Sequence, residues 1–185
     1  MIYLIDHEDS FTFNLAHLLG EFDDVVVSNY YEIDKLKIVK AKIIVLSPGP
    51  GEPKDYPITT KIYNQFKGKK KILGVCLGFQ QILYAEGGKI IQQNKIFHGY
   101  QSVVLTLPSS KLFKNIKNLS AGRYHSLKLQ EPFYSNTLKI TMRCKMTKTA
   151  MALEDITNNV FGFQFHPDSF LTKNGKLLIQ KILSA

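Results

Sequence analysis

The segment at residues 71–80 reads KILGVCLGFQ, and it joins an apolar run to a helical pattern through one cysteine. Gly74 and Gly78 stand two positions before and after Cys76. This is the arrangement of a nucleophile elbow, in which a strand turns sharply into a helix and flanking glycines avoid clashes. A cysteine at the start of a helix faces free N–H groups and the helix dipole, which favour the thiolate and lower its pKa. The alternative is a buried cysteine that packs as a small apolar residue, but the two glycines favour a nucleophile at Cys76.

The elements on both sides of this segment alternate between strand and helix patterns. Continuous apolar runs are typical of strands buried on both faces of a parallel sheet, and they lie at residues 1–5, 25–27, 43–46 and 71–75. Helices are predicted at residues 11–20, with Asp9 or Ser10 as N-cap, and at 80–85 and 173–183. Further short strands are predicted at residues 102–107, 138–142, 150–153 and 160–165. The pattern predicts an α/β fold with a wound, mostly parallel sheet flanked by helices, and with antiparallel additions.

Length and composition favour one compact domain over residues 1–185, since 44% of the residues are hydrophobic. No stretch approaches the roughly 18 apolar residues of a membrane span. With only two cysteines, Cys76 and Cys144, a disulfide scaffold is not expected, and the protein is predicted to be soluble and cytoplasmic. Neither CxxC nor HxxxH occurs, so we expect no structural metal.

The net charge of +9 raises nucleic acid as a partner, and residues 67–71 form the densest basic cluster. However, only Arg123 and Arg143 among the 24 basic residues are arginine, the residue that reads phosphate and guanine with two hydrogen bonds. The lysine cluster also precedes an apolar strand, as a solvated loop would. We therefore expect no nucleic-acid partner.

Residues 164–168 read QFHPD and place a histidine and a carboxylate directly after the last predicted strand. Ligands of open α/β sheets usually bind beyond the carboxyl ends of the parallel strands. If the chain stays extended through Pro167, His166 and Asp168 point to the same side. The carboxylate can then orient the imidazole, and together with Cys76 the pattern predicts a Cys-His-Asp triad.

A rigid loop follows another predicted strand, because residues 47–53 read SPGPGEP and alternate proline with glycine. A simple tight turn is one interpretation. The other is that the Gly51 N–H, together with the Leu77 N–H, points into the pocket and forms an oxyanion hole.

Taken together, six separated motifs resemble those of one family, the class I (triad) glutamine amidotransferases. The chain is most similar to the small subunits of anthranilate synthase and aminodeoxychorismate synthase, and the resemblance covers nearly all of it. The motifs are DHEDSFTFN at 6–14, SPGPGEP at 47–53, GVCLGFQ at 74–80, KIFHG at 95–99, RYHSL at 123–127 and FGFQFHPDS at 161–169.

The resemblance implies a flavodoxin-like sheet and a glutaminase that needs no cofactor. Glutamine would be cleaved through a γ-glutamyl thioester on Cys76, with His166 as acid and base and Asp168 orienting it. Ammonia would pass to a chorismate-using synthase subunit. Motif matching assigns the glutamine pocket to Gly49, Gly51, Gln80, Ser126 and Leu127. It also suggests Asp9, Ser10 and Phe11 as residues of the partner interface.

One residue departs from the family pattern, because similar proteins usually carry glutamate at the position of Asp168. Aspartate is one methylene shorter, so the backbone moves closer, a water bridges the gap, or orientation is poorer. Two other functions remain open: a same-fold thiol hydrolase of γ-glutamyl substrates, and a weakly active or non-catalytic regulatory subunit of the same complex. For His125, a structural role and a pocket role are both open. The sequence does not choose between the anthranilate and aminodeoxychorismate pathways.

Overall fold

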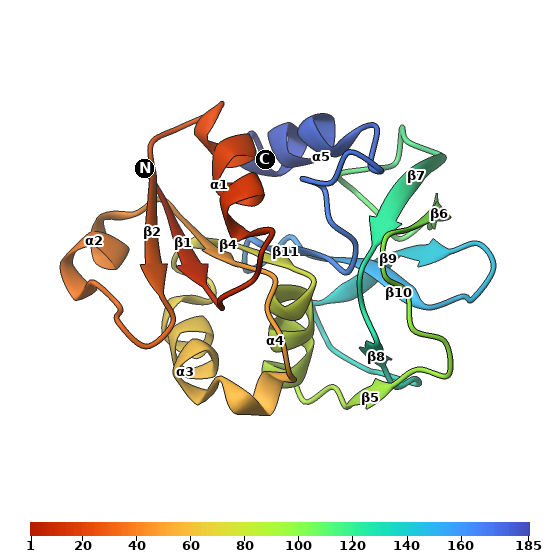
Figure 1. The fold of residues 1–185 in the computed structure, drawn as a ribbon, viewed down its shortest axis with the longest axis horizontal. Coiled ribbons are helices and arrows are strands. Elements are labelled where there is room, and N and C mark those ends of the chain that lie inside the picture. The colour runs from red at the N-terminus through yellow and green to blue at the C-terminus, as the bar shows by residue number, and fades with distance from the viewer.

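The computed structural model describes all 185 residues, and its centre is a nine-stranded sheet (Figure 1). Five neighbouring strands are parallel and run in the order β2-β1-β3-β4-β11. Their bounds are β1 Ile2–Asp6, β2 Val25–Asn29, β3 Ile43–Leu46, β4 Lys71–Val75 and β11 Val160–Phe163. Most of their residues are buried, as the continuous apolar runs predict.

The other half of the sheet is antiparallel and continues from β11 in the order β10-β9-β6-β7. These strands are β6 Tyr100–Thr106, β7 Asn118–Arg123, β9 Lys139–Cys144 and β10 Ala150–Asp155. Two short strands, β5 Ile90–Gln92 and β8 Leu127–Leu129, form a separate antiparallel pair. This pair lies below the large sheet in Figure 1 and borders the site described below.

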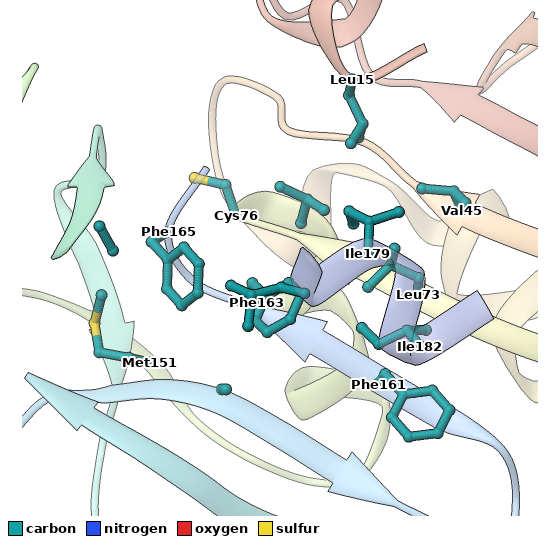
Figure 2. Close-up of a cluster of buried hydrophobic side chains, with 14 of the residues drawn as sticks. Leu15, Val45, Leu73, Cys76, Met151, Phe161, Phe163, Phe165, Ile179 and Ile182 are labelled. Carbon is teal, nitrogen blue, oxygen red and sulfur yellow. The ribbon is translucent and has the colours of Figure 1, made fainter. Parts of the chain in front are cut away.

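Helices cover both faces of the parallel half (Figure 1). On one face, α1 Thr12–Gly20 and α5 Gly175–Leu183 pack on a cluster that includes Leu73 and Phe163. Figure 2 shows Leu73, Phe163 and Ile179 gathered between the sheet and α5. On the other face lie α2 Lys35–Lys40, α3 Pro57–Phe66 and α4 Leu77–Ala85, which bury a second cluster. α1, α3 and α5 bury one side against the sheet, whereas α4 buries every residue from Leu77 to Leu83 and α2 buries only Ile38. Such burial is the main source of helix stability in a folded chain.

The predicted fold class is confirmed, although the antiparallel part is as large as the parallel part. Three details were wrong. Phe11, not Asp9 or Ser10, is the N-cap of α1, and Asp9 Oδ1 instead accepts the Phe11 N–H at 2.8 Å. The last strand ends at Phe163, and α4 begins at Leu77 directly after the cysteine. The sequence patterns missed α2, α3, β5, β7, β8 and a 3-10 turn at Pro53–Asp55.

Candidate active site

Cys76 lies at the sharp turn between β4 and α4, with φ +53° and ψ −101°, a conformation that is rare for a non-glycine residue. A Cβ added to Gly74 would overlap the backbone of Gly78, and one added to Gly78 would overlap the Leu46 carbonyl. The predicted reason for the two glycines, close approach of backbones around the elbow, is confirmed. The strand and helix therefore hold the sulfur at the carboxyl edge of the parallel strands.

The expected low pKa of Cys76 is wrong in this structure. Burial, together with the negative charge of Asp9, raises the pKa of the thiol to about 12. Hydrogen bonds from the Leu77 N–H and from Gln164 lower it by less. Only 7% of the residue is exposed, and removing the thiolate from water outweighs the helix terminus. The resting thiol is protonated, so a base must take its proton before attack.

His166 is held in place by backbone and aromatic contacts. Its N–H donates to the Gly122 carbonyl of β7 at 3.0 Å, and its own carbonyl accepts the Thr172 hydroxyl. The rings of Phe11 and Tyr124 lie against the imidazole, with centroid distances of 4.8 and 4.9 Å. Burial and the neighbouring His125 lower the pKa of His166 to about 3. The imidazole is therefore neutral at physiological pH and free to accept a proton.

Asp168 lies beside the imidazole but does not reach it. The distance between His166 Nδ1 and Asp168 Oδ1 is 3.8 Å, longer than a hydrogen bond. No protein group is within hydrogen-bonding distance of either carboxyl oxygen or either imidazole nitrogen. Burial, with a smaller effect of Asp9, raises the pKa of Asp168 to about 7. The extended strand assumed from the sequence does not persist past Phe163, but the two side chains still lie next to each other.

The thiol opens onto a pocket of about 220 Å³. All five residues that the motifs assigned to glutamine line it, as do both predicted oxyanion donors: Gly49, Gly51, Gln80, Ser126, Leu127 and Leu77. Gly51 has φ +69°, which a glycine adopts without strain. Of the three predicted interface residues, Asp9 lines the pocket, Ser10 is exposed and Phe11 covers His166.

Gln164 is a site residue that the sequence analysis missed. Its buried Nε2 donates to Cys76 Sγ at 3.9 Å, and its Oε1 accepts from Gln80 Nε2 at 3.1 Å. The side chain thus connects the thiol to the pocket wall. The only signal in the sequence was its place two residues before His166, on the same side of an extended chain.

His125 also lines the pocket, and its hydrogen bonds fix its tautomer. Its Nε2 accepts from Arg123 Nε at 3.0 Å, so Nδ1 carries the proton and donates to the Leu127 carbonyl at 2.8 Å. Burial, followed by the charge of Arg123, lowers the pKa of His125 to about 4. The structure therefore shows a hydrogen-bonded, neutral histidine that supports the wall at Ser126 and Leu127.

The family model described as "Glutamine amidotransferase class-I" matches residues 3–185, and the chain belongs to this family. It is 39% identical over 188 residues to anthranilate synthase component 2 of Pyropia yezoensis, covering 99% of this chain and 98% of that one. It is 33% identical to the aminodeoxychorismate/anthranilate synthase component 2 of Bacillus subtilis, covering 99% and 95%.

The chain also matches a part of a longer protein and the fold of a solved structure. The chain is 37% identical to the bifunctional protein TrpGD of Thermotoga maritima, of which it spans only 32% while 99% of this chain is covered. Its fold matches the crystal structure of a putative GMP synthase protein from Thermoplasma acidophilum with a TM-score of 0.85. That match covers 99% of this chain and 92% of the other at 18% identity. None of the helices is long and apolar enough to cross a membrane.

Proposed function

We propose that this chain hydrolyses the side-chain amide of glutamine and passes the ammonia to a chorismate-using synthase subunit. The observation that carries the proposal is the position of Cys76, at a strained elbow that opens onto a pocket lined by every residue assigned to glutamine. The names of the relatives support a partner that uses the ammonia to make anthranilate or aminodeoxychorismate.

The proposed chemistry uses the neutral resting state of the site. The lowered pKa of His166 leaves the imidazole unprotonated. Neither of its nitrogens has a hydrogen-bond partner at rest, so His166 accepts the thiol proton, as Cys76 Sγ attacks the amide carbon, once the site closes and brings the imidazole to the sulfur. The Gly51 and Leu77 N–H groups stabilise the oxyanion. The proton then passes to the departing nitrogen, ammonia leaves and a thioester remains. Water, deprotonated by His166, cleaves the thioester to glutamate and restores the thiol.

The proposed partner acts on the same site. Phe11 contacts both His166 and Tyr124, and the neighbouring Ser10 is exposed, so a subunit docked at Asp9, Ser10 and Phe11 would press directly on the aromatic cover of the histidine. The 3.8 Å gap at Asp168 favours a subunit that is slow alone and is activated when the partner closes the site. We further propose that residues 1–185 form one amidotransferase domain that works in the cytoplasm.

The test is glutamate release from glutamine by the purified chain, with and without a candidate synthase subunit and chorismate. Cys76→Ser removes the nucleophile, and Cys144→Ser is the matched control because Cys144 lies outside the pocket. Partner-stimulated release that is lost in Cys76→Ser and kept in Cys144→Ser supports the proposal, and the product formed identifies the pathway. Equal background release by all three proteins favours the regulatory subunit. Release of glutamate from γ-glutamyl peptides but not from glutamine favours the thiol hydrolase.

A further inference from the structure

The peptide between Pro50 and Gly51 carries one of the two N–H groups of the proposed oxyanion hole. Both residues line the glutamine pocket, and the Gly51 N–H donates to no group of this chain. The peptide is trans and therefore planar, so the Pro50 carbonyl and the Gly51 N–H point in opposite directions. Whatever holds this carbonyl also sets the direction of the N–H.

The hydroxyl of Tyr56 holds the Pro50 carbonyl. It donates to the carbonyl oxygen, with 2.9 Å between the two oxygens. Tyr56 lies between the 3-10 turn at Pro53–Asp55 and α3, is almost fully buried, and does not line the glutamine pocket. The carbonyl is thus turned towards Tyr56, and the Gly51 N–H points to the opposite side, where the pocket lies.

The Tyr56 ring is fixed by two other aromatic rings. His7 and Tyr30 meet it edge to face, each with 4.9 Å between ring centroids. His7 is itself fully buried, and its Nε2 lies 2.9 Å from the Thr59 hydroxyl oxygen on α3. Burial raises the pKa of Tyr56 to about 12, so the hydroxyl keeps its proton at physiological pH. It is therefore a fixed hydrogen-bond donor.

The backbone alone does not select this direction of the peptide. Proline followed by glycine with φ +69° is the pattern of a type II turn, and a type I turn is reached by flipping the peptide between the two residues. Glycine adopts φ of either sign at little cost. After such a flip the Pro50 carbonyl would point into the pocket, where its negative end would repel the oxyanion instead of stabilising it.

We propose that Tyr56 is a positioning residue of the oxyanion hole, whose hydrogen bond to the Pro50 carbonyl keeps the Gly51 N–H aimed at the substrate oxygen. The inference rests on the proposed glutaminase function. Tyr56 lies outside the glutamine pocket, so its effect reaches the substrate only through this peptide. The aimed N–H acts mainly on the transition state, in which the oxygen becomes charged, and less on the binding of the neutral amide.

NMR of the full-length chain tests the direction of the peptide without any measurement of activity. Labelling with carbonyl-13C proline and 15N glycine selects the two Pro-Gly pairs, Pro48–Gly49 and Pro50–Gly51. Tyr56→Phe removes the hydroxyl and keeps the ring. We expect it to move the Pro50 carbonyl signal upfield and to shift the Gly51 N–H signal. Pro48 is the internal control, because its carbonyl accepts the Ser47 hydroxyl at 2.6 Å and should keep its signal.

The kinetic test is glutamate release with the synthase partner and chorismate present. The kcat of Tyr56→Phe should fall about 10–100-fold, less than the roughly 10²–10³-fold loss of an absent oxyanion donor, because the peptide still samples the productive direction. KM should change little. Tyr63→Phe is the matched control and should have the kcat of the parent. Tyr63 is another buried tyrosine, on α3, and its hydroxyl donates to Glu86 at 2.7 Å outside the pocket.

The outcomes separate this inference from the function on which it rests. No glutamate release by the parent in any mixture would overturn the proposed function. Normal release by the parent, with equal kcat in Tyr56→Phe and Tyr63→Phe, would overturn the role of Tyr56 alone. A rise in KM without a fall in kcat, or an unmoved Pro50 carbonyl signal, would do the same.

Discussion

Lengthening the carboxylate at position 168 should make the triad work better. The Asp168→Glu change adds one carbon–carbon bond of about 1.5 Å, which is enough to bring a carboxyl oxygen from 3.8 Å to hydrogen-bonding distance of His166 Nδ1. A hydrogen bond to a charged group contributes about 1.5–3 kcal/mol. Fitting an extra methylene into a buried site costs about 1–3 kcal/mol. The pocket of about 260 Å³ that borders Asp168 and Pro167 keeps that cost at the low end.

The net gain of about 1 kcal/mol corresponds to about a fivefold higher kcat/KM for glutamate release. The assay measures glutamate formed with the synthase partner and chorismate present, and urea unfolding checks that the variant is folded. Asp168→Asn is the isosteric control. Because the parent carboxyl has a pKa of about 7 and makes no hydrogen bond, its loss should lower the rate less than about tenfold. An orienting carboxylate that is fully engaged contributes about 10⁴-fold.

The opposite pattern would refute this reasoning. If Asp168→Asn lowers kcat by about 10³ or more, and Asp168→Glu brings no gain in a folded protein, then the aspartate is already engaged with His166 during catalysis. The 3.8 Å gap would then have no consequence for the rate.

Three further predictions follow from burial and hydrogen bonding. Burial raises the pKa of the Cys144 thiol, but hydrogen bonds at Thr147 and Met146 and the charge of Arg123 bring this pKa below its usual value, whereas the pKa of Cys76 is about 12. Limited iodoacetamide labelling without glutamine should therefore modify Cys144 before Cys76, and a mass spectrum that shows Cys76 labelled first would contradict this. Gln164→Leu removes the oxygen that accepts a hydrogen bond from Gln80 Nε2 at 3.1 Å, and it should lower the free energy of unfolding, measured in urea, by about 1–3 kcal/mol. An unchanged free energy would mean that this hydrogen bond does not stabilise the fold. The free energy of unfolding should fall as the pH drops from about 6.5 towards 4, because three buried histidines with folded pKa values of about 3 to 4 stay neutral while the unfolded chain binds three protons. Asp168, with a folded pKa of about 7, holds one proton that the unfolded chain lacks, so the net slope near pH 5 is about 2.7 kcal/mol per pH unit, and a flat profile would count against these pKa shifts. These histidines are His7, His125 and His166.

The elbow was predictable because its constraint is local. Glycines two positions either side of a cysteine, between an apolar strand and a helix, indicate a tight turn. The physical cause is the overlap that a Cβ would make at Gly74 and Gly78. The buried parallel strands were predictable for a similar reason, since a strand covered on both faces is apolar without interruption. β7 and β8 gave weaker patterns and were missed, because β7 reads NLSAGR, with glycine and arginine at buried positions, and β8 has only three residues.

The chemical state of the site was not predictable from the same residues. The helix terminus suggested a thiolate at Cys76, but the pKa depends on how much water the folded chain removes, and burial reversed the sign. The contact of Gln164 with the thiol joins residues 88 positions apart. No local spacing specifies such a contact.

The sequence by itself predicted the wound α/β sheet and the elbow at its carboxyl edge, because backbone geometry and apolar periodicity are written in neighbouring residues. The residues expected around the glutamine pocket came instead from the resemblance of separated motifs to one family. Only the tertiary structure decided that Cys76 and His166 rest as neutral groups, that Asp168 stops 3.8 Å short of the imidazole, and that Arg123 is buried without an anion. These properties depend on how deeply each group is buried and on the spatial distance between segments that are far apart in the sequence. Both are set only when the chain folds.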